Sequence, residues 1–295
     1  MRAPRCPPAP VVLLAALSVA APGMAQRQPA ITALLQAPVS PRFSGLGGAA
    51  VAMIGHAGSV FTNPAGIAPV RIMSLEGAYA RLTDSSSYFM GAAAVRLGPA
   101  SLGGGVRYLR FDAGRAMHDN LESVASLVTR VKGVALGLSA NYFAVEDSAG
   151  SVTRTLTSDV AVTVYVFEIA ALAYTAQNIG RAGFGDAVLP LPSTMSVGFS
   201  LNLIDTYSNG RLLATVERQW IEGDGRTLFG IEGGAVFYGV GVVARVGIGG
   251  RVDHSPFTRL GWGGTLVLGR AALDYAYLER RLEGPLHLFG LRLTP

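Results

Sequence analysis

The stretch that decides the fold is Met195-Ser-Val-Gly-Phe-Ser-Leu-Asn-Leu203, in which apolar residues alternate with small or polar ones. Side chains two residues apart lie on the same face of a β-strand. One face of this segment therefore carries large apolar side chains, and the other carries serine, glycine and asparagine. The pattern returns in Val240–Ile248 and Leu260–Leu268, where the second face includes several glycines. This periodicity of two predicts strands that are apolar on one side only.

The composition indicates where such strands fold. The chain has 295 residues, of which 50% are hydrophobic and 15% charged, whereas soluble domains carry about 25% charged residues. After residue 25, no uninterrupted apolar run reaches the roughly 18 residues that a membrane-spanning helix requires. A closed transmembrane β-barrel accommodates this hydrophobicity in alternating strands, because its backbone hydrogen bonds are all satisfied between neighbouring strands.

A water-soluble β-sandwich would also alternate, and it is the alternative fold. Its water-facing residues would be lysine, glutamate and threonine, whereas many second-face residues here are glycine, alanine or serine. Aromatic residues such as Tyr142, Tyr207, Trp220 and Trp262 fall mostly near segment ends, where the interfacial girdle of a membrane barrel would place them. We therefore expect an all-β, antiparallel transmembrane β-barrel.

Counting the alternating segments between residues 72 and 293 gives fourteen, an even number as single-chain outer-membrane barrels have. Short connections are expected at Gly98-Pro99, Gly133, Phe167, Tyr238-Gly239 and Gly269-Arg270, and a five-residue turn at 205–209. Longer connections are expected at 112–120, 147–153, 178–193, 221–227 and 250–256. Because such barrels have short periplasmic turns and longer outer loops, both ends of the barrel are predicted to lie in the periplasm.

The first 25 residues are typical of a signal peptide. Arg2 and Arg5 precede an apolar core from Val11 to Ala21, and Gly23-Met24-Ala25 fits a cleavage site. The single cysteine, Cys6, would be removed with this segment, which excludes disulfides and thiol chemistry from the mature chain. Residues 26–71 are rich in proline and glycine and lack the period of two. They are expected to form a separate segment before a barrel of residues 72–295.

The formal net charge of +5 does not indicate a nucleic-acid partner. The basic residues are nearly all arginines, with Lys132 the only lysine, and they occur singly along the chain. No run forms a polybasic patch, so we expect no nucleic-acid binding.

Two stretches of the N-terminal segment carry a family resemblance. Phe43-Ser-Gly-Leu-Gly-Gly-Ala-Ala-Val-Ala52, followed by Phe61-Thr-Asn-Pro-Ala-Gly-Ile-Ala68, resembles the N-terminal signature of FadL-like outer-membrane proteins, and especially their PorV/PorQ branch. The resemblance implies a fourteen-stranded barrel whose N-terminal segment, residues 26–71, lies in the lumen as a hatch. The hatch motif would consist of Gly45, Gly47, Gly48, Asn63, Pro64, Ala65 and Gly66.

Glycines suit both partners of such an arrangement, because a residue without a side chain lets two backbones approach closely. The wall positions that would provide this space are Gly103, Gly105, Gly241, Gly247, Gly261 and Gly263.

Six charged residues fall on positions that the alternation directs into the lumen: Glu76, Arg107, Asp159, Arg245, Asp274 and Arg292. Buried charges must be paired. They are expected to form a polar network that fixes the hatch to the wall. Alternatively they form a polar path or contact an anionic ligand, with Arg245 and Arg292 donating to a carboxylate.

Little else in the sequence indicates chemistry. The four histidines, His56, His118, His254 and His287, lie far apart, so no metal site and no cofactor are expected. Gly45-Leu-Gly-Gly-Ala-Ala50 approximates a dinucleotide fingerprint, but no hydrophobic strand precedes it. His118-Asp119 could be half of an acid–base pair in a barrel hydrolase, which is a second alternative function.

The resemblance implies a non-enzymatic protein in the outer membrane of a Gram-negative cell. PorV-like members receive exported cargo proteins in type IX secretion, and this role is our first interpretation. The alternative is a FadL-like transporter of long-chain fatty acids or other hydrophobic small molecules. The expected partners are outer-membrane lipid, together with secretion-system components or a hydrophobic ligand in the lumen.

Overall fold

The computed structural model describes Leu34 and residues 37–83, 86–111, 120–146, 151–166, 169–184, 188–204, 210–249, 257–280 and 285–295. The predicted signal peptide lies outside these residues. Among the described residues, no helix is both long and apolar enough to cross a membrane.

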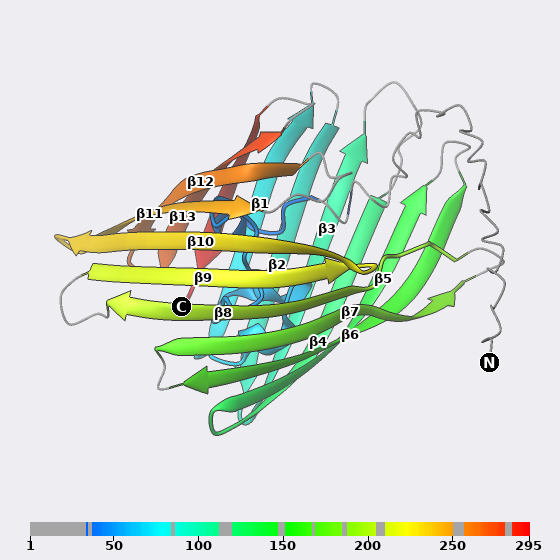
Figure 1. Ribbon diagram of the computed structural model, residues 1–295, viewed down its shortest axis with the longest axis horizontal. Helices are drawn as coiled ribbons and strands as arrows, with labels where there is room; N and C mark the ends of the chain where they lie inside the picture. Colours follow the sequence, from blue (N-terminus) through cyan, green and yellow to red (C-terminus); the bar gives the residue numbers. More distant parts are fainter. Residues whose placement is uncertain are drawn as a thin grey trace, which may run out of the picture.

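Fourteen strands form one closed antiparallel barrel, in which each strand pairs with its neighbours in sequence and β1 pairs with β14 (Figure 1). The predicted fold class and strand number are confirmed. The strands are β1 (Met73–Thr83), β2 (Ser86–Leu97), β3 (Ala100–Phe111), β4 (Asn120–Val131), β5 (Val134–Glu146), β6 (Val152–Val166), β7 (Ala170–Gly183), β8 (Thr194–Ile204), β9 (Gly210–Ile221), β10 (Asp224–Phe237), β11 (Val240–Gly249), β12 (Phe257–Leu268), β13 (Ala271–Arg280) and β14 (Leu286–Leu293).

The two faces of the wall differ as the alternation predicts. In β5, Leu136 and Leu138 are 51% and 59% exposed on one face, whereas Ala135, which points to the other face, is buried. Large apolar side chains are exposed on the outer face of every strand from β1 to β14. Soluble proteins rarely expose so continuous an apolar surface to water, so the outer face contacts lipid. A closed antiparallel barrel with an apolar belt is an outer-membrane protein.

The two ends of the barrel have different connections. We call the end where β1 begins and β14 finishes the termini end, and the opposite end the loop end. Short turns at the termini end include Gly98-Pro99 and Tyr238-Gly239, as predicted. Most longer connections gather at the loop end, which fits the prediction that the termini end is periplasmic.

The predicted outer loop at 221–227 is wrong. β9 ends at Ile221 and β10 begins at Asp224, and these two residues are paired, so Glu222-Gly223 forms a two-residue hairpin turn. Both turn residues have positive φ, 51° at Glu222 and 98° at Gly223, as a tight turn between twisted strands requires. The loop predicted from residue 178 also begins later, because β7 continues to Gly183 past a register shift opposite Ser158.

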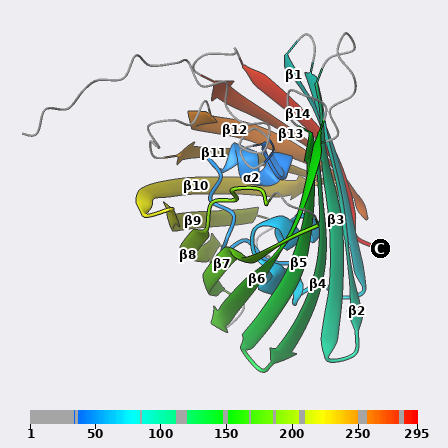
Figure 2. The ribbon, with the colours of Figure 1, turned by 90° about the vertical axis from the view of Figure 1, so that its right-hand side faces the viewer.

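The N-terminal segment contains α2 (Pro41–Gly45) and two 3₁₀ helices, η1 (Ala57–Phe61) and η2 (Pro64–Ile67). Ser40 caps α2 by accepting a hydrogen bond from the Arg42 backbone N–H at 3.2 Å. α2 contacts β11–β14, whereas η1 contacts β1–β4 and η2 contacts β3–β6. Figure 2 shows this blue and cyan segment between the strands on opposite sides of the barrel. Its described residues therefore pack against the inner face of the wall.

Candidate functional site

The glycines of the first motif place the N-terminal backbone directly on the wall. Gly47 and Gly48 have φ values of 68° and 87°, in the left-handed region that favours glycine. A Cβ atom added to Gly247 of β11 would lie 2.0 Å from the carbonyl carbon of Leu46. One added to Gly261 of β12 would lie 2.2 Å from the carbonyl oxygen of Ser44. Only glycine at these wall positions lets α2 and its following turn lie so close.

Other wall glycines face the two 3₁₀ helices. An added Cβ atom on Gly103 would meet Ile67, and one on Gly105 would lie 2.4 Å from the ring of Phe61. At two of the expected positions an added Cβ atom would meet the wall first, although the Gly263 backbone nitrogen would lie 3.4 Å from a Cβ atom added to Gly45. The nearest atoms belong to Val267 at Gly241 and to the Tyr275 carbonyl at Gly263, both within the wall.

The Asn63-Pro64-Ala65-Gly66 motif joins η2 to β6 and to the preceding chain. The Asn63 side-chain amide donates to the Val51 carbonyl at 2.6 Å and to the Thr163 hydroxyl at 2.9 Å. The Tyr165 hydroxyl donates to the Ala65 carbonyl at 2.9 Å. Pro64 starts η2, where its missing N–H costs no hydrogen bond. Gly66 accepts a hydrogen bond from the Gly55 N–H at 2.8 Å.

A chain of buried ion pairs surrounds α2. Arg42 binds Glu232 of β10, and Arg245 of β11 lies 3.4 Å from the same carboxylate. Arg245 also approaches Asp274 of β13 at 3.3 Å, and Arg292 of β14 contacts Asp274 at 2.5 Å. This ionic cluster thus contains three of the six charged residues that were predicted to face the lumen, together with Arg42 and Glu232.

Two further carboxylates hold the N-terminal backbone. Glu76 of β1 accepts hydrogen bonds from the Ser40 hydroxyl and, at 3.0 Å, from the Gly58 N–H. Glu217 of β9 accepts from the N–H groups of Ala50 and Val51 at 2.9 and 3.0 Å. Sequence reasoning missed Arg42, Glu217 and Glu232. The alternation of their strands directs both glutamates inward and could have found them, but no periodicity marks Arg42.

The remaining two predicted residues lie apart from the ionic cluster. Arg107 of β3 pairs with Glu122 of β4, with 2.5 Å from Nε to the carboxylate, and reaches the Ala37 carbonyl at 3.4 Å. Asp159 of β6 accepts from the Ser139 hydroxyl and the Asn178 N–H, at 3.1 and 2.9 Å. The six predicted residues therefore all lie inside the barrel but do not form one group.

His56 lies between two arginines. Its Nε2 contacts the Arg42 guanidinium, and its Nδ1 lies 3.1 Å from a terminal nitrogen of Arg292. Burial, followed by the charges of Arg42, Arg292, Arg211 and Arg245, lowers the pKa of His56 well below its usual value. The imidazole is therefore neutral at pH 7, and its one unprotonated ring nitrogen accepts a hydrogen bond from only one of the two arginines.

Part of the lumen wall toward the loop end is apolar. A group of inward-facing wall side chains there is at most 9% exposed and belongs to one hydrophobic cluster with the N-terminal segment. Leu34 and two residues between β7 and β8, Leu189 and Leu191, join the same cluster. The wall residues are Leu82, Tyr88, Leu109, Phe143, Val145, Leu278, Leu286 and Leu288. The lumen is thus polar around α2. Toward the loop end, an apolar patch on β1–β3, β5, β13 and β14 lies beside buried polar residues such as Asn120, Glu122 and Thr155.

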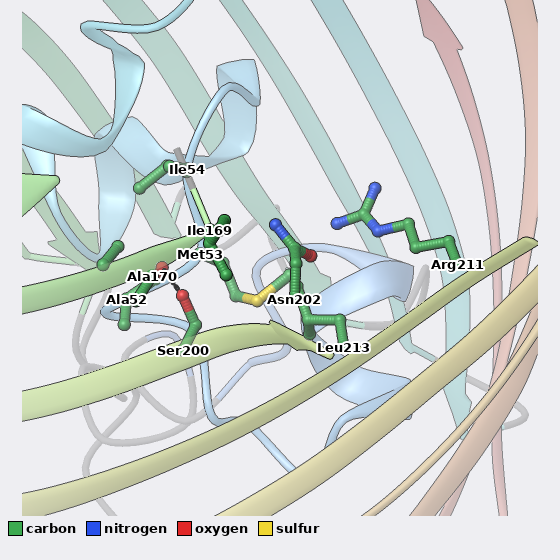
Figure 3. Close-up of a pocket in the computed structure, with 10 residues that line it drawn as sticks. Ala52, Met53, Ile54, Ile169, Ala170, Ser200, Asn202, Arg211 and Leu213 are labelled. Carbon is green, nitrogen blue, oxygen red and sulfur yellow. Dashed lines mark hydrogen bonds between the residues drawn. The ribbon is translucent and has the colours of Figure 1, made fainter. Parts of the chain in front are cut away.

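A small cavity of about 30 Å³ lies between the N-terminal segment and β7–β9 at the termini end (Figure 3). Met53 and Ile54 line one side, and Asn202 and Arg211 come from the wall. The Ser200 hydroxyl donates to the Ala52 carbonyl at 2.9 Å beside it. Its volume is about that of one water molecule, so it is not a substrate chamber.

Histidine chemistry receives no support from the described residues. No group of three or more histidine, cysteine, aspartate or glutamate side chains comes together among them to hold a metal. His287 contacts the Tyr275 hydroxyl on the lipid-facing side, with 2.8 Å between the two polar atoms. His118, Asp119 and His254 lie outside the described residues.

The sequence matches no protein-family model and no curated protein. The structure is similar to the toluene transporter TbuX of Ralstonia pickettii, with a TM-score of 0.55 and 11% identity over 86% of this chain and 98% of that one. The P. putida toluene transporter TodX gives 0.55 and 11% over 85% and 95%. A Pseudomonas aeruginosa FadL homologue gives 0.52 and 10% over 86% and 97%.

Identities this low relate the folds alone. The similarity covers most of each chain and includes the barrel, so it supports the FadL-like part of the resemblance. It gives no support to the narrower assignment to the PorV/PorQ branch or to a role in type IX secretion. The chain therefore has a FadL-like outer-membrane barrel fold.

Proposed function

We propose that this protein is an outer-membrane channel for hydrophobic small molecules, with residues 26–71 as a hatch in its lumen. The observation that carries the proposal is the apolar patch of the inner wall toward the loop end, on β1–β3, β5, β13 and β14. The lumen of a water-filled porin is polar, whereas Leu109, Phe143 and Leu288 are buried inward-facing residues of an apolar cluster here. An apolar lining favours compounds that leave water readily. The fold similarity to toluene transporters agrees with this choice of substrate class.

The hatch role rests on how the N-terminal segment is held. Its contacts with the wall include ion pairs, hydrogen bonds to Glu76 and Glu217, and glycine-mediated backbone contacts. Polar contacts can be exchanged for contacts with water or a ligand, whereas a fully apolar interface has no such alternative partners. We infer that the hatch shifts during passage and that an anionic ligand, where one is carried, would compete for Arg245 and Arg292.

Uptake measurements test the proposal. A Gram-negative host without its own uptake channel for the probe would express the protein and receive radiolabelled toluene or oleate. Leu109→Asn and Leu288→Asn should reduce uptake several-fold, because each places an amide in the apolar lining. Thr215→Asn, at a buried polar position of β9, is the matched control. Unchanged uptake in both leucine variants, with normal gel mobility before boiling, would remove the proposal.

The type IX interpretation has its own test. If the protein serves type IX secretion, deletion of its gene should leave exported proteins in the periplasm and should leave hydrocarbon uptake unchanged. The barrel hydrolase requires that His118→Ala abolish a measurable hydrolytic activity.

A further inference from the structure

Asn120, the first residue of β4, has a buried side chain without hydrogen bonds. It lies on the inner face of the wall, because fully buried residues alternate with more exposed ones along β4 from Asn120 and Glu122 onward. The residue is 0% exposed, and neither its side-chain oxygen nor its side-chain nitrogen has a hydrogen-bond partner in the part of the chain that the structure describes. Burial of an unpaired amide costs free energy. An orphaned amide that faces a lumen therefore points to a partner from outside the chain.

The residues beside Asn120 on the neighbouring strands are apolar. On β3, its Cα partner is Leu109. On β5, Val145 follows Ala144, which is paired with Leu121, so Val145 lies opposite Asn120. Leu109 and Val145 are 1% and 5% exposed and belong to the apolar patch of the inner wall. Their side chains have no polar atom, so neither can satisfy the amide.

The next inward-facing residue of β4, Glu122, restricts the charge of the missing partner. It lies about 7 Å from Asn120 along the strand, at roughly 3.3 Å per residue. Glu122 forms a buried ion pair with Arg107 of β3, which also donates to the Ala37 carbonyl at 3.4 Å. Arg107 is thus already paired, and the Glu122 carboxylate would repel an anion. The position at Asn120 therefore favours a neutral group.

A hydroxyl group meets these requirements. The Asn120 amide offers an acceptor oxygen and two N–H donors, and a hydroxyl can accept from the nitrogen while it donates to the oxygen. The apolar remainder of such a molecule would contact Leu109 and Val145, which favours a hydrophobic alcohol or phenol. We propose that Asn120, Leu109 and Val145 form a subsite for neutral hydroxylated hydrophobic compounds. The proposal rests on the channel function proposed above and names the substrate class that the channel prefers.

The N-terminal segment reaches the same height of the lumen. Ala37 accepts a hydrogen bond from Arg107, and both Leu34 and Ala37 belong to the same apolar cluster as Leu109. A ligand that displaces these side chains gives Asn120 the hydrogen bonds that leucine and alanine side chains cannot form. A hydrocarbon of the same shape would displace them without this gain. The orphaned amide thus favours hydroxylated compounds over hydrocarbons when the segment shifts.

Ligand binding to the full-length protein in detergent tests the subsite. The probes are radiolabelled 4-octylphenol and octylbenzene, which differ by one hydroxyl. Asn120→Leu should weaken 4-octylphenol binding about fivefold, which corresponds to one neutral hydrogen bond of about 1 kcal/mol. Octylbenzene should bind this variant as tightly as wild type or more tightly, because no unpaired amide is then buried against it. Partition of each probe into micelles is the same for both proteins and cancels in the comparison.

Two controls and a second variant accompany this experiment. Asn202→Leu makes the same substitution on β8 at the termini end, beside the small cavity, and should bind both probes as wild type does. The probe 4-octylbenzoate carries an anionic carboxylate in place of the hydroxyl, and its binding should be the same in Asn120→Leu and wild type. Asn120→Ala should show the same loss for 4-octylphenol, and it replaces Asn120→Leu if the leucine variant lacks normal unboiled gel mobility.

The outcomes separate the subsite from the channel. If wild type binds neither 4-octylphenol nor octylbenzene, the channel function and the subsite both fail. If wild type binds both probes and Asn120→Leu changes their binding equally or not at all, the channel function stands and the subsite is wrong. An equal loss of 4-octylbenzoate and 4-octylphenol binding would overturn the selection of neutral groups.

Discussion

Arg42 and Glu232 are 190 positions apart in the chain, yet Arg42 donates to both carboxylate oxygens, at 2.8 Å from Nε and 2.6 Å from Nη2. Both side chains are only 3% exposed. This paired geometry is the most specific that arginine makes with a carboxylate. It fixes α2 of the N-terminal segment to β10 of the wall.

Removing one member of this pair should release α2. Glu232→Gln leaves a buried guanidinium without its charge partner, and such losses cost about 3–5 kcal/mol. We expect a protease to cleave the N-terminal segment of this variant much faster than that of wild type, while the barrel itself stays folded. Limited proteolysis followed by mass spectrometry of the products measures this.

Two variants sharpen that experiment. Glu279→Gln removes a carboxylate that is exposed on β13 and should leave the cleavage rate unchanged. R42M/E232M removes both charges, which should recover much of the lost packing. Equal cleavage of Glu232→Gln and wild type would show that the pair does not hold the segment.

Gly247→Ala should disturb the same region through sterics alone. Its new methyl group would lie 2.0 Å from the Leu46 carbonyl carbon, so either the turn at Gly47 or strand β11 must move. Overpacking of this kind costs about 1–3 kcal/mol. The temperature at which the unboiled gel band shifts should fall, whereas Gly233→Ala on the lipid face should keep the wild-type temperature. A fall of the same size in both variants would assign the effect to strand propensity.

The sequence predicts the wall well because one physical rule, alternation between lipid and lumen, applies to every strand. It fails at Glu222-Gly223, where a two-residue turn and a longer loop have the same composition. It also fails for Arg42 and His56, because the N-terminal segment has no repeating pattern. Asp159, a residue of the wall, also shows how far prediction from the sequence reaches. Alternation directs it inward, but only the folded structure shows that its partners are Ser139 and Asn178.

Packing of the N-terminal segment should weaken as the pH falls from 7.5 to 5.5. The pKa of His56 is lowered in the folded protein by burial and by Arg42, Arg292, Arg211 and Arg245. A released segment has the ordinary histidine pKa of about 6.5. It therefore binds a proton in this range that the packed segment does not bind, and release becomes more favourable at lower pH. The carboxylates nearest to these arginines form ion pairs with them, Glu232 with Arg42 and Asp274 with Arg292.

Protease cleavage of the segment as a function of pH measures the effect. Wild type should be cleaved faster at pH 5.5 than at pH 7.5, after correction for the protease's own pH dependence. The His56→Gln variant has no titrating group at this position, so its corrected cleavage rate should be the same at pH 5.5 and pH 7.5. Should His56→Gln keep the full pH dependence, another group is responsible.

A disulfide between the N-terminal segment and the wall tests whether the segment moves during transport. Asn63 and Thr163 are suitable because their side chains are hydrogen-bonded at 2.9 Å, and the only native cysteine is Cys6 in the predicted signal peptide. In oxidised N63C/T163C, η2 is tied to β6. Uptake of the hydrophobic probe should fall at least tenfold and return on reduction. N141C/T157C joins β5 to β6 within the wall, at a side-chain distance of 3.4 Å, and should transport equally well in both redox states, as should the single variants. Full uptake by the oxidised N63C/T163C protein would mean that substrate passes beside a stationary segment.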